Sequence, residues 1–154
     1  MMPKPAERGD AEVEATLAVA ADNANVSTDG KLNIIGVFQE FTPPAFTALV
    51  PQLTLVVSWS AEPVEFNSQK EVRISFMGPD PDEKIDLPPM QLAIPEAPRA
   101  GEPAIVHQIL TLQGLPLQRP GPHAFYVVVG GETKTRIPLY VREPNGEQGK
   151  EAPE

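Results

Sequence analysis

The sequence predicts an all-β fold: one antiparallel β-sandwich of seven or eight short strands joined by proline-rich connections. Two observations lead to this fold class. The chain has 19 prolines among 154 residues, and between Ala11 and Arg142 they recur too often for any long helix. The apolar segments between the prolines are short, alternate in polarity and are rich in β-branched residues. Strands of this kind bury one face each against a second sheet.

Length and end composition divide the chain into one domain and two tails. A chain of 154 residues suits a single domain with a real core. We expect the sandwich to span residues 12–142 and the segments 1–11 and 143–154 to be disordered, the latter as an acidic tail. The first residues, MMPKPAERGDAEVE, show no secretory signal, and no apolar run is long enough to cross a membrane. A cytoplasmic protein is therefore expected.

The first half of the chain contains four predicted strands, separated by segments rich in turn-forming residues. They are Val13–Ala21, Lys31–Phe41, Leu53–Ser60 and Lys70–Met77. The small residues of the first strand also suit a helix, and residues 22–30 after it predict a turn. In the third strand Trp59 continues the inward alternation, so it is expected to be a core aromatic. The last of the four alternates most clearly, with Val72, Ile74 and Phe76 inward.

Two long connections carry most of the prolines. Phe41–Gln52 is predicted to cross between sheets without backbone pairing, anchored by Phe46 and Leu49. In the segment Gly78–Gly101, pairing by Lys84–Leu87 or Met90–Ile94 must be short or at a sheet edge.

The second half predicts three more strands: Pro103–Leu112, His123–Val129 and Thr133–Val141. A turn-rich connection over Gly114–Pro122 precedes the second of these, and Gly130-Gly131 forms a hairpin before the third. The strand His123–Val129 is apolar on both faces, which is typical of a strand that lies under a covering loop or in an interface. The chain's own proline-rich loops or a second subunit are both able to supply the cover.

Composition excludes several classes of function. The chain has no cysteine and a formal net charge of -9, which removes disulfide scaffolds, thiolate zinc sites and cysteine nucleophiles. An acidic chain without clustered Lys and Arg is not expected to bind nucleic acid or anionic lipid. No glycine motif for a phosphate group is present. No cofactor is expected.

Two sets of polar residues were candidates for chemistry. His107 and His123 lie on predicted strands, and we expect partly buried histidines bonded to backbone, because no nucleophile-elbow pattern accompanies them. For calcium the candidates are Asp22, Asn23, Asn25 and Asp29, and then Asp80, Asp82, Glu83 and Asp86. Both groups are also ordinary turn formers. The sequence therefore predicts no catalytic residue and no metal site.

A basic and aromatic stripe on the last strand is the predicted contact with a partner. It consists of Lys134, Arg136, Tyr140 and Arg142. Such a stripe suits an acidic partner, and it equally suits the task of keeping an edge strand soluble.

Two segments resemble a known family. They are ADNANVSTDGKLNIIGVF (Ala21–Phe38) and PGPHAFYVVVGGETKTRIPLYV (Pro120–Val141). They resemble a family of small uncharacterised bacterial proteins, a domain of unknown function, over most of Leu17–Val141. The resemblance implies an immunoglobulin-like sandwich, and it brings no activity and no functional residues. His123 departs from the family pattern, where an aromatic is expected, as does Pro79–Asp82, where an Asp-Gly turn is expected.

We therefore expect a non-catalytic protein-binding or assembly module whose partner is another protein or a second copy. The alternative is a small-ligand binder or hydrolase that uses polar residues such as Asp22, His107 and His123.

Overall fold

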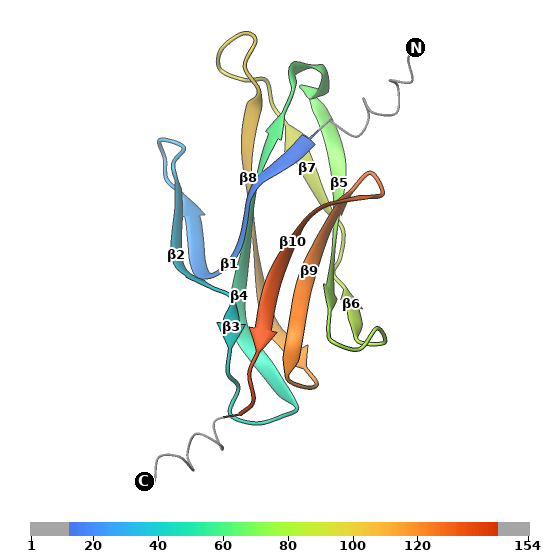
Figure 1. The fold of residues 1–154 in the computed structure, drawn as a ribbon. Coiled ribbons are helices and arrows are strands. Elements are labelled where there is room, and N and C mark those ends of the chain that lie inside the picture. Colours follow the sequence, from blue (N-terminus) through green and yellow to red (C-terminus); the bar gives the residue numbers. More distant parts are fainter. Residues whose placement is uncertain (1–12, 145–154) are drawn as a thin grey trace.

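The computed structural model describes residues 13–144 and shows two β-sheets packed face to face (Figure 1). The strands are β1 (Val13–Val26), β2 (Leu32–Phe38), β3 (Glu40–Phe41), β4 (Ala48–Ala61), β5 (Ser68–Met77), β6 (Lys84–Asp86), β7 (Met90–Ile94), β8 (Ala104–Leu117), β9 (Gly121–Val129) and β10 (Glu132–Val141). One 3-10 turn, η1 (Pro63–Glu65), precedes β5. No helix within residues 13–144 is long and apolar enough to span a membrane.

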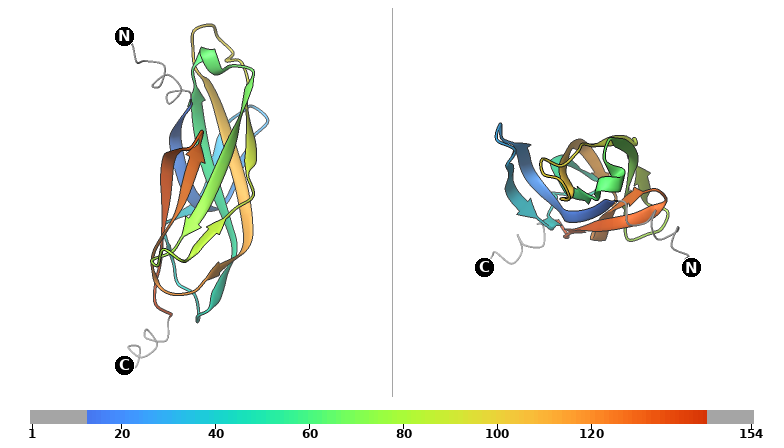
Figure 2. Two further views of the ribbon diagram at one scale, coloured as in Figure 1. Left: turned by 90° about the vertical axis from the view of Figure 1, so that its right-hand side faces the viewer. Right: turned by 90° about the horizontal axis from the view of Figure 1, so that it is seen from above.

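The strand order defines the two sheets. Sheet A has the order β2-β1-β4-β8 and is antiparallel throughout. Sheet B has the order β3-β10-β9-β5-β6. β7 pairs with the first half of β5, and β6 pairs with its last three residues, on the same side of the strand. Figure 2 shows the two layers edge on. The predicted all-β sandwich of two packed sheets is confirmed, with ten strands rather than seven or eight. The predicted disordered segment 1–11, and residues 145–154 of the predicted disordered segment 143–154, lie outside the described residues.

The core lies between the inner faces of the sheets. Its largest fully buried side chains include Trp59, Phe125, Leu53 and Leu55. The Trp59 side chain is 0% exposed, and its Nε1 donates a hydrogen bond to Oε1 of Gln108 on β8 at 3.0 Å. A buried indole needs such a partner for its N–H. The prediction that Trp59 is a core aromatic is confirmed.

Three predicted connections are partly strand, so these boundaries were wrong. β1 continues through the expected turn to Val26, β4 begins at Ala48, and β8 runs to Leu117. Pro51 fits in β4 because β1 pairs with β4 only as far as Thr54. Pro116 fits because β8 has β4 as its strand partner on one side only. A proline is tolerated in a strand where its missing N–H is not needed.

Beyond Ala21, β1 leaves β4 and pairs only with β2, so residues 22–37 form a two-stranded arm (Figures 1 and 2). The Asn residues that predicted a turn pair within the arm, where Asn33 Nδ2 donates to Asn25 Oδ1 at 3.0 Å. Gly36 has a φ of 72° and packs against the side chain of Asp22. The left-handed conformation and this contact together favour glycine there.

His123 extends the core near the start of β9 in sheet B. Its ring stacks on Phe76 at a centroid distance of 5.3 Å, and Phe76 also contacts Phe125. Its Nδ1 donates to the Gly121 carbonyl at 3.0 Å, as expected for a buried histidine. Burial lowers the pKa of His123, while the Gly121 bond and the charge of Glu83 act in the opposite direction.

Replacing Trp59 by alanine is expected to destabilise the fold strongly. Truncating a large buried aromatic costs about 3 to 5 kcal/mol, because the cavity left behind does not fully collapse. Urea denaturation measures the free energy of unfolding. Leu49→Ala on the same strand is the control, since Leu49 is 60% exposed and its loss should cost less than about 0.5 kcal/mol. Equal stability of the Trp59→Ala variant and the wild type would refute the core role.

The burial of His123 predicts a pH-dependent stability. Its folded pKa lies below the ordinary value of 6.5, so the unfolded chain takes up the proton first as the pH falls through that value. The free energy of unfolding should therefore drop as the pH falls through 6.5 and below. In His123→Phe, which keeps an aromatic ring in the stack, that component of the drop should disappear. Parallel stability curves for the variant and the wild type would contradict this assignment.

Candidate functional site

The outer face of sheet A is formed by cross-strand rows of side chains. Residues directly opposite one another in an antiparallel pair share a face. The register therefore gives the rows Val37, Ala21, Thr54 and Thr111; Val19, Val56 and Ile109; and Leu17, Ser58 and His107. The rows run from the arm across β1 and β4 to β8.

The middle of this outer face is closed by its own side chains. Every residue of β4 from Leu53 to Trp59 is buried, although only alternate ones face the core. On the outer side Thr54 Oγ1 lies 3.3 Å from Thr111 Oγ1, and Ser58 Oγ lies 2.8 Å from His107 Nδ1. These bonds satisfy the buried hydroxyls.

β4, rather than β9, is the strand that is buried most completely on both faces. The expected strand was His123–Val129, where Tyr126 and Val128 on the outer face are only partly buried. The strand buried on both faces is β4. Its outer face was missed because Thr54 and Ser58 are polar, and only a knowledge of their partners on β8 reveals that they are buried.

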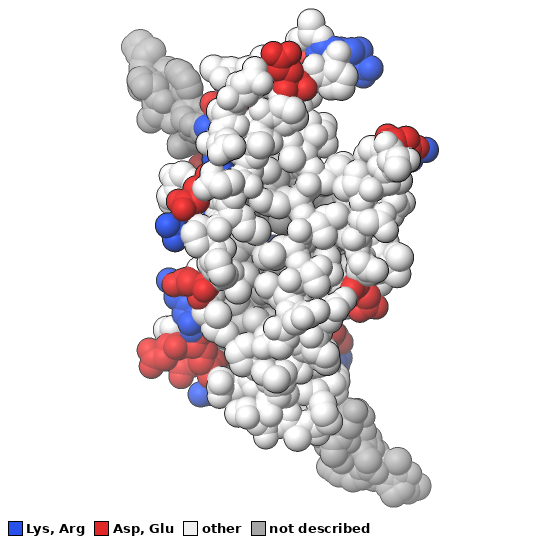
Figure 3. All heavy atoms as spheres, turned by 180° about the vertical axis from the view of Figure 1, so that it is seen from behind, with Lys and Arg blue, Asp and Glu red and all other residues white. Residues whose placement is uncertain are grey.

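The outer face of sheet A is also almost free of charge. β2, β4 and β8 contain no Asp, Glu, Lys or Arg, and β1 contains only Glu14 and Asp22. On the face seen in Figure 3, charged side chains lie along the margins and the middle is uncharged. Ile35 is 58% exposed, Val37 54% and Ile105 54%. An open sheet face that meets only water normally carries polar and charged residues.

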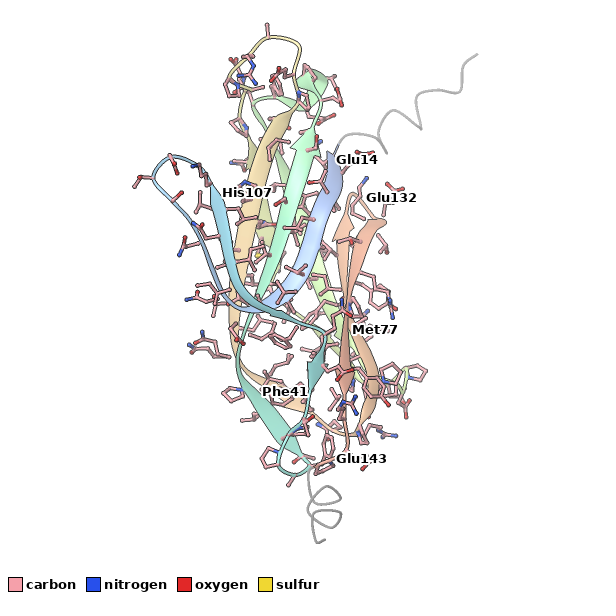
Figure 4. The ribbon with its side chains drawn as sticks, turned by 60° about the vertical axis from the view of Figure 1, so that its left-hand side comes forward. Glu14, Phe41, Met77, His107, Glu132 and Glu143 are labelled. Carbon is pink, nitrogen blue, oxygen red and sulfur yellow. The ribbon has the colours of Figure 1, made fainter. Side chains whose placement is uncertain are left out.

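A groove of about 670 Å³ lies beside the start of β8. Ile105, Val106 and His107 line it from β8. Val26 and Gly30 of the arm line one part, and residues 67–69 and 93–95 of β5, β7 and their flanks line another. Figure 4 shows His107 on β8 near the level of the arm's turn. The groove thus joins the outer face of sheet A to the edge of β8.

Backbone hydrogen bonds hold the lining segments of the groove in place. Asn67 N–H donates to the Ile94 carbonyl at 2.7 Å, and its side chain donates to Glu96 at 3.2 Å. In the arm, Ser27 N–H donates to the Lys31 carbonyl at 2.8 Å, and Gly30 N–H donates to the Ser27 carbonyl at 2.9 Å. These bonds form the groove before any partner binds.

The stripe predicted as a partner contact lies on sheet B, away from this groove. Arg142 bonds to Glu40 at 2.8 Å, an interaction that lowers the pKa of Glu40. Lys134 lies in a β-bulge and pairs with Glu132 at 2.9 Å. Arg136 and Tyr140 are exposed. Two of the three cations are thus paired with carboxylates, and the role of the stripe in binding stays a prediction.

The two acidic clusters do not come together. Asp22 and Asp29 belong to the arm, whereas Asp80 and Asp82 lie in the turn between β5 and β6 (Figure 1). Asp29 pairs with Lys31, and Arg119 pairs with Asp80 and Glu83. Within residues 13–144 no three His, Asp or Glu side chains are placed to hold a metal ion.

The two histidines have different surroundings. Ser58 and His107 form a pair, but no hydrogen bond of the described residues joins His107 to a carboxylate, and Ser58 is 4% exposed. A nucleophilic serine requires such an orienting group and access for the substrate. His123 lies in a separate pocket of about 430 Å³ with Glu83, Lys84 and Gln118. The Oε1 atom of Glu83 is buried beside Gly78 without a hydrogen-bond partner.

Comparison with solved structures supports the fold. The chain is similar to the alkylpurine DNA glycosylase AlkC of Pseudomonas fluorescens bound to DNA (TM-score 0.52, 12% identity, 85% of this chain and 30% of that chain). It is also similar to a mutant β-glucosidase of Listeria innocua (TM-score 0.50, 11% identity, 86% of this chain and 16% of that chain). This chain therefore spans less than a third of either enzyme.

A third similar structure has nearly the same length. It is an immunoglobulin-like protein of Pseudomonas aeruginosa (TM-score 0.42, 13% identity, 85% of this chain and 97% of that chain). No curated protein matches the chain. At the level of sequence families, the profile of the family of unknown function DUF6941 matches residues 16–142, which is most of the sandwich. The chain therefore belongs to the family of unknown function DUF6941.

Proposed function

We propose that this chain is a non-catalytic, cytoplasmic protein-binding module that uses the outer face of sheet A. The observation that carries the proposal is the uncharged outer face with the exposed residues Ile35, Val37 and Ile105. Exposed apolar side chains on an uncharged face are typical of a protein interaction site. Sheet B gives the contrast, because its strands β5, β6 and β10 carry Lys, Arg, Asp or Glu.

The surroundings of Ser58 and His107 favour a structural role for this pair. The hydroxyl and the imidazole both lie in the outer-face rows that fix β8 against β4. A hydrogen bond between neighbouring strands rigidifies the surface that a partner meets.

A small-ligand binder is the second candidate function. The observation that favours it is the pocket of about 430 Å³ that His123 lines together with Glu83 and Lys84. Because the Nδ1 of His123 carries the proton given to Gly121, the neutral ring leaves Nε2 as an acceptor. A ligand of this pocket would therefore be a hydrogen-bond donor.

Photo-cross-linking in cells tests the protein-binding module. We expect a photoreactive side chain at position 35 or 105 to yield a discrete cross-linked protein, because these positions lie on the proposed face. The same group at positions 136 and 140 examines the stripe on sheet B. Cross-links from 136 and 140 alone would move the interface to the stripe, and no cross-link from any of the four would argue against a binding module.

An active-site probe tests the absence of catalysis. We expect a fluorophosphonate, which modifies activated serines, to leave Ser58 unlabelled, because Ser58 is buried and His107 has no carboxylate partner among the described hydrogen bonds. Mass spectrometry of the treated protein reads the result, with Ser58→Ala as the matched control. Labelling that is confined to Ser58 would support the hydrolase alternative.

A further inference from the structure

The edges of the two sheets differ in how well they are protected. Natural proteins shield edge strands by making them short, or with charges, prolines or bulges. β3 has two residues. β6 carries Lys84 and Asp86, and Pro88-Pro89 separates it from β7. β2 has seven residues and contains Gly36 in the left-handed conformation.

β8 has none of these protections over most of its length. It has 14 residues, and from Ala104 to Gln113 it contains no charge, no proline and no glycine. Among the described strands it pairs with β4 only. In an antiparallel ladder alternate residues direct their N–H and C=O groups away from the partner strand. About half of these residues thus present a free donor and acceptor at the edge.

The groove beside β8 lies at this unprotected edge. Its lining includes Ile105 to His107 of β8, Val26 and Gly30 of the arm, and Ala93 to Pro95 at the end of β7. Its volume of about 670 Å³ is within the range of binding pockets, roughly 300 to 1,000 Å³.

We propose that an extended segment of another protein binds in this groove as an added strand of sheet A, paired with β8. The proposal rests on the proposed protein-binding function and names the chemistry of the partner. The free main-chain groups of β8 select an extended backbone, and pockets beside the edge select alternate side chains. The middle of the segment should be uncharged and free of proline, since each inward N–H must donate to β8.

A single segment fits this site better than the β8 of a second copy. The arm and the end of β7 both line the groove, so the occupant has to lie between them, and one extended strand has less bulk there than a whole sandwich. Each copy also has a formal net charge of -9, and like net charges oppose association. A separate segment carries neither cost.

A peptide library displayed on phage tests the proposal with the full chain as bait. We expect selected peptides to be rich in β-branched and aromatic residues and poor in proline, as strands are. Ile105→Lys should weaken their binding by about tenfold or more, because it places a charge at the uncharged edge. Leu49→Lys, also on sheet A but outside the groove lining, is the matched control and should bind as the wild type does.

Two backbone measurements decide between strand addition and ordinary side-chain contact. Two N-methylated forms of a selected peptide should be compared, one methylated at its odd residues and the other at its even residues. One form should lose binding and the other should keep it, since only alternate N–H groups face β8. Binding should likewise slow hydrogen exchange at alternate amides of β8 that exchange rapidly in the free protein. Uniform effects along the peptide, or protection confined to other strands, would overturn the proposal.

The remaining outcomes separate this proposal from its rivals. If β8 amides become protected as the concentration of the chain rises without peptide, the occupant is a second copy and the proposal of a foreign segment is wrong. If cross-links form at positions 35 and 105 but no selected peptide shows the alternate pattern, strand addition fails while the binding function stands. If neither occurs, both fail.

Discussion

β4 pairs with β1 on one side and β8 on the other, and both of its faces are buried, so its position constrains both faces of sheet A. Its inner face carries Trp59, Leu53 and Leu55 into the core. Its outer face supports the uncharged rows that include Val56, Thr54 and Ser58. Each additional buried strand face removes apolar area from water. The groove and the edge of β8 are fixed because β8 is fixed against β4.

The sequence predicted the architecture well because the core-facing alternation does not depend on the partner strand. β5 shows this, since Val72, Ile74 and Phe76 are buried as their period of two requires. Trp59 is in the core for the same reason. The resemblance of Ala21–Phe38 and Pro120–Val141 to a family without assigned function is also confirmed by the match to DUF6941.

The candidate site was much harder to predict, because it depends on neighbours that are distant in the sequence. Asn23 and Asn25 are turn formers by type, but they lie in the arm because β2 pairs with them. Pro51 and Pro116 belong to connections that the sequence predicts to be unpaired, yet each lies in a strand at a point where that strand lacks a neighbour on one side. The groove combines the arm, β7 and β8, which are separated by long stretches of chain. No local pattern reports such a combination.

The pairing of β3 with β10 bears on the order in which the chain folds during synthesis. Glu40 lies beside Tyr140 and Phe41 beside Val141 in a parallel arrangement, so β3 finds its partner only after about a hundred further residues have been made. The ion pair between Glu40 and Arg142 closes the same contact at its end. Sheet A contains all its strands once Leu117 has been made, whereas sheet B remains incomplete until the ribosome has passed Val141. On a growing chain, the part of the core that β9 and β10 complete therefore stays open longest, and during this interval it offers apolar surface to a chaperone.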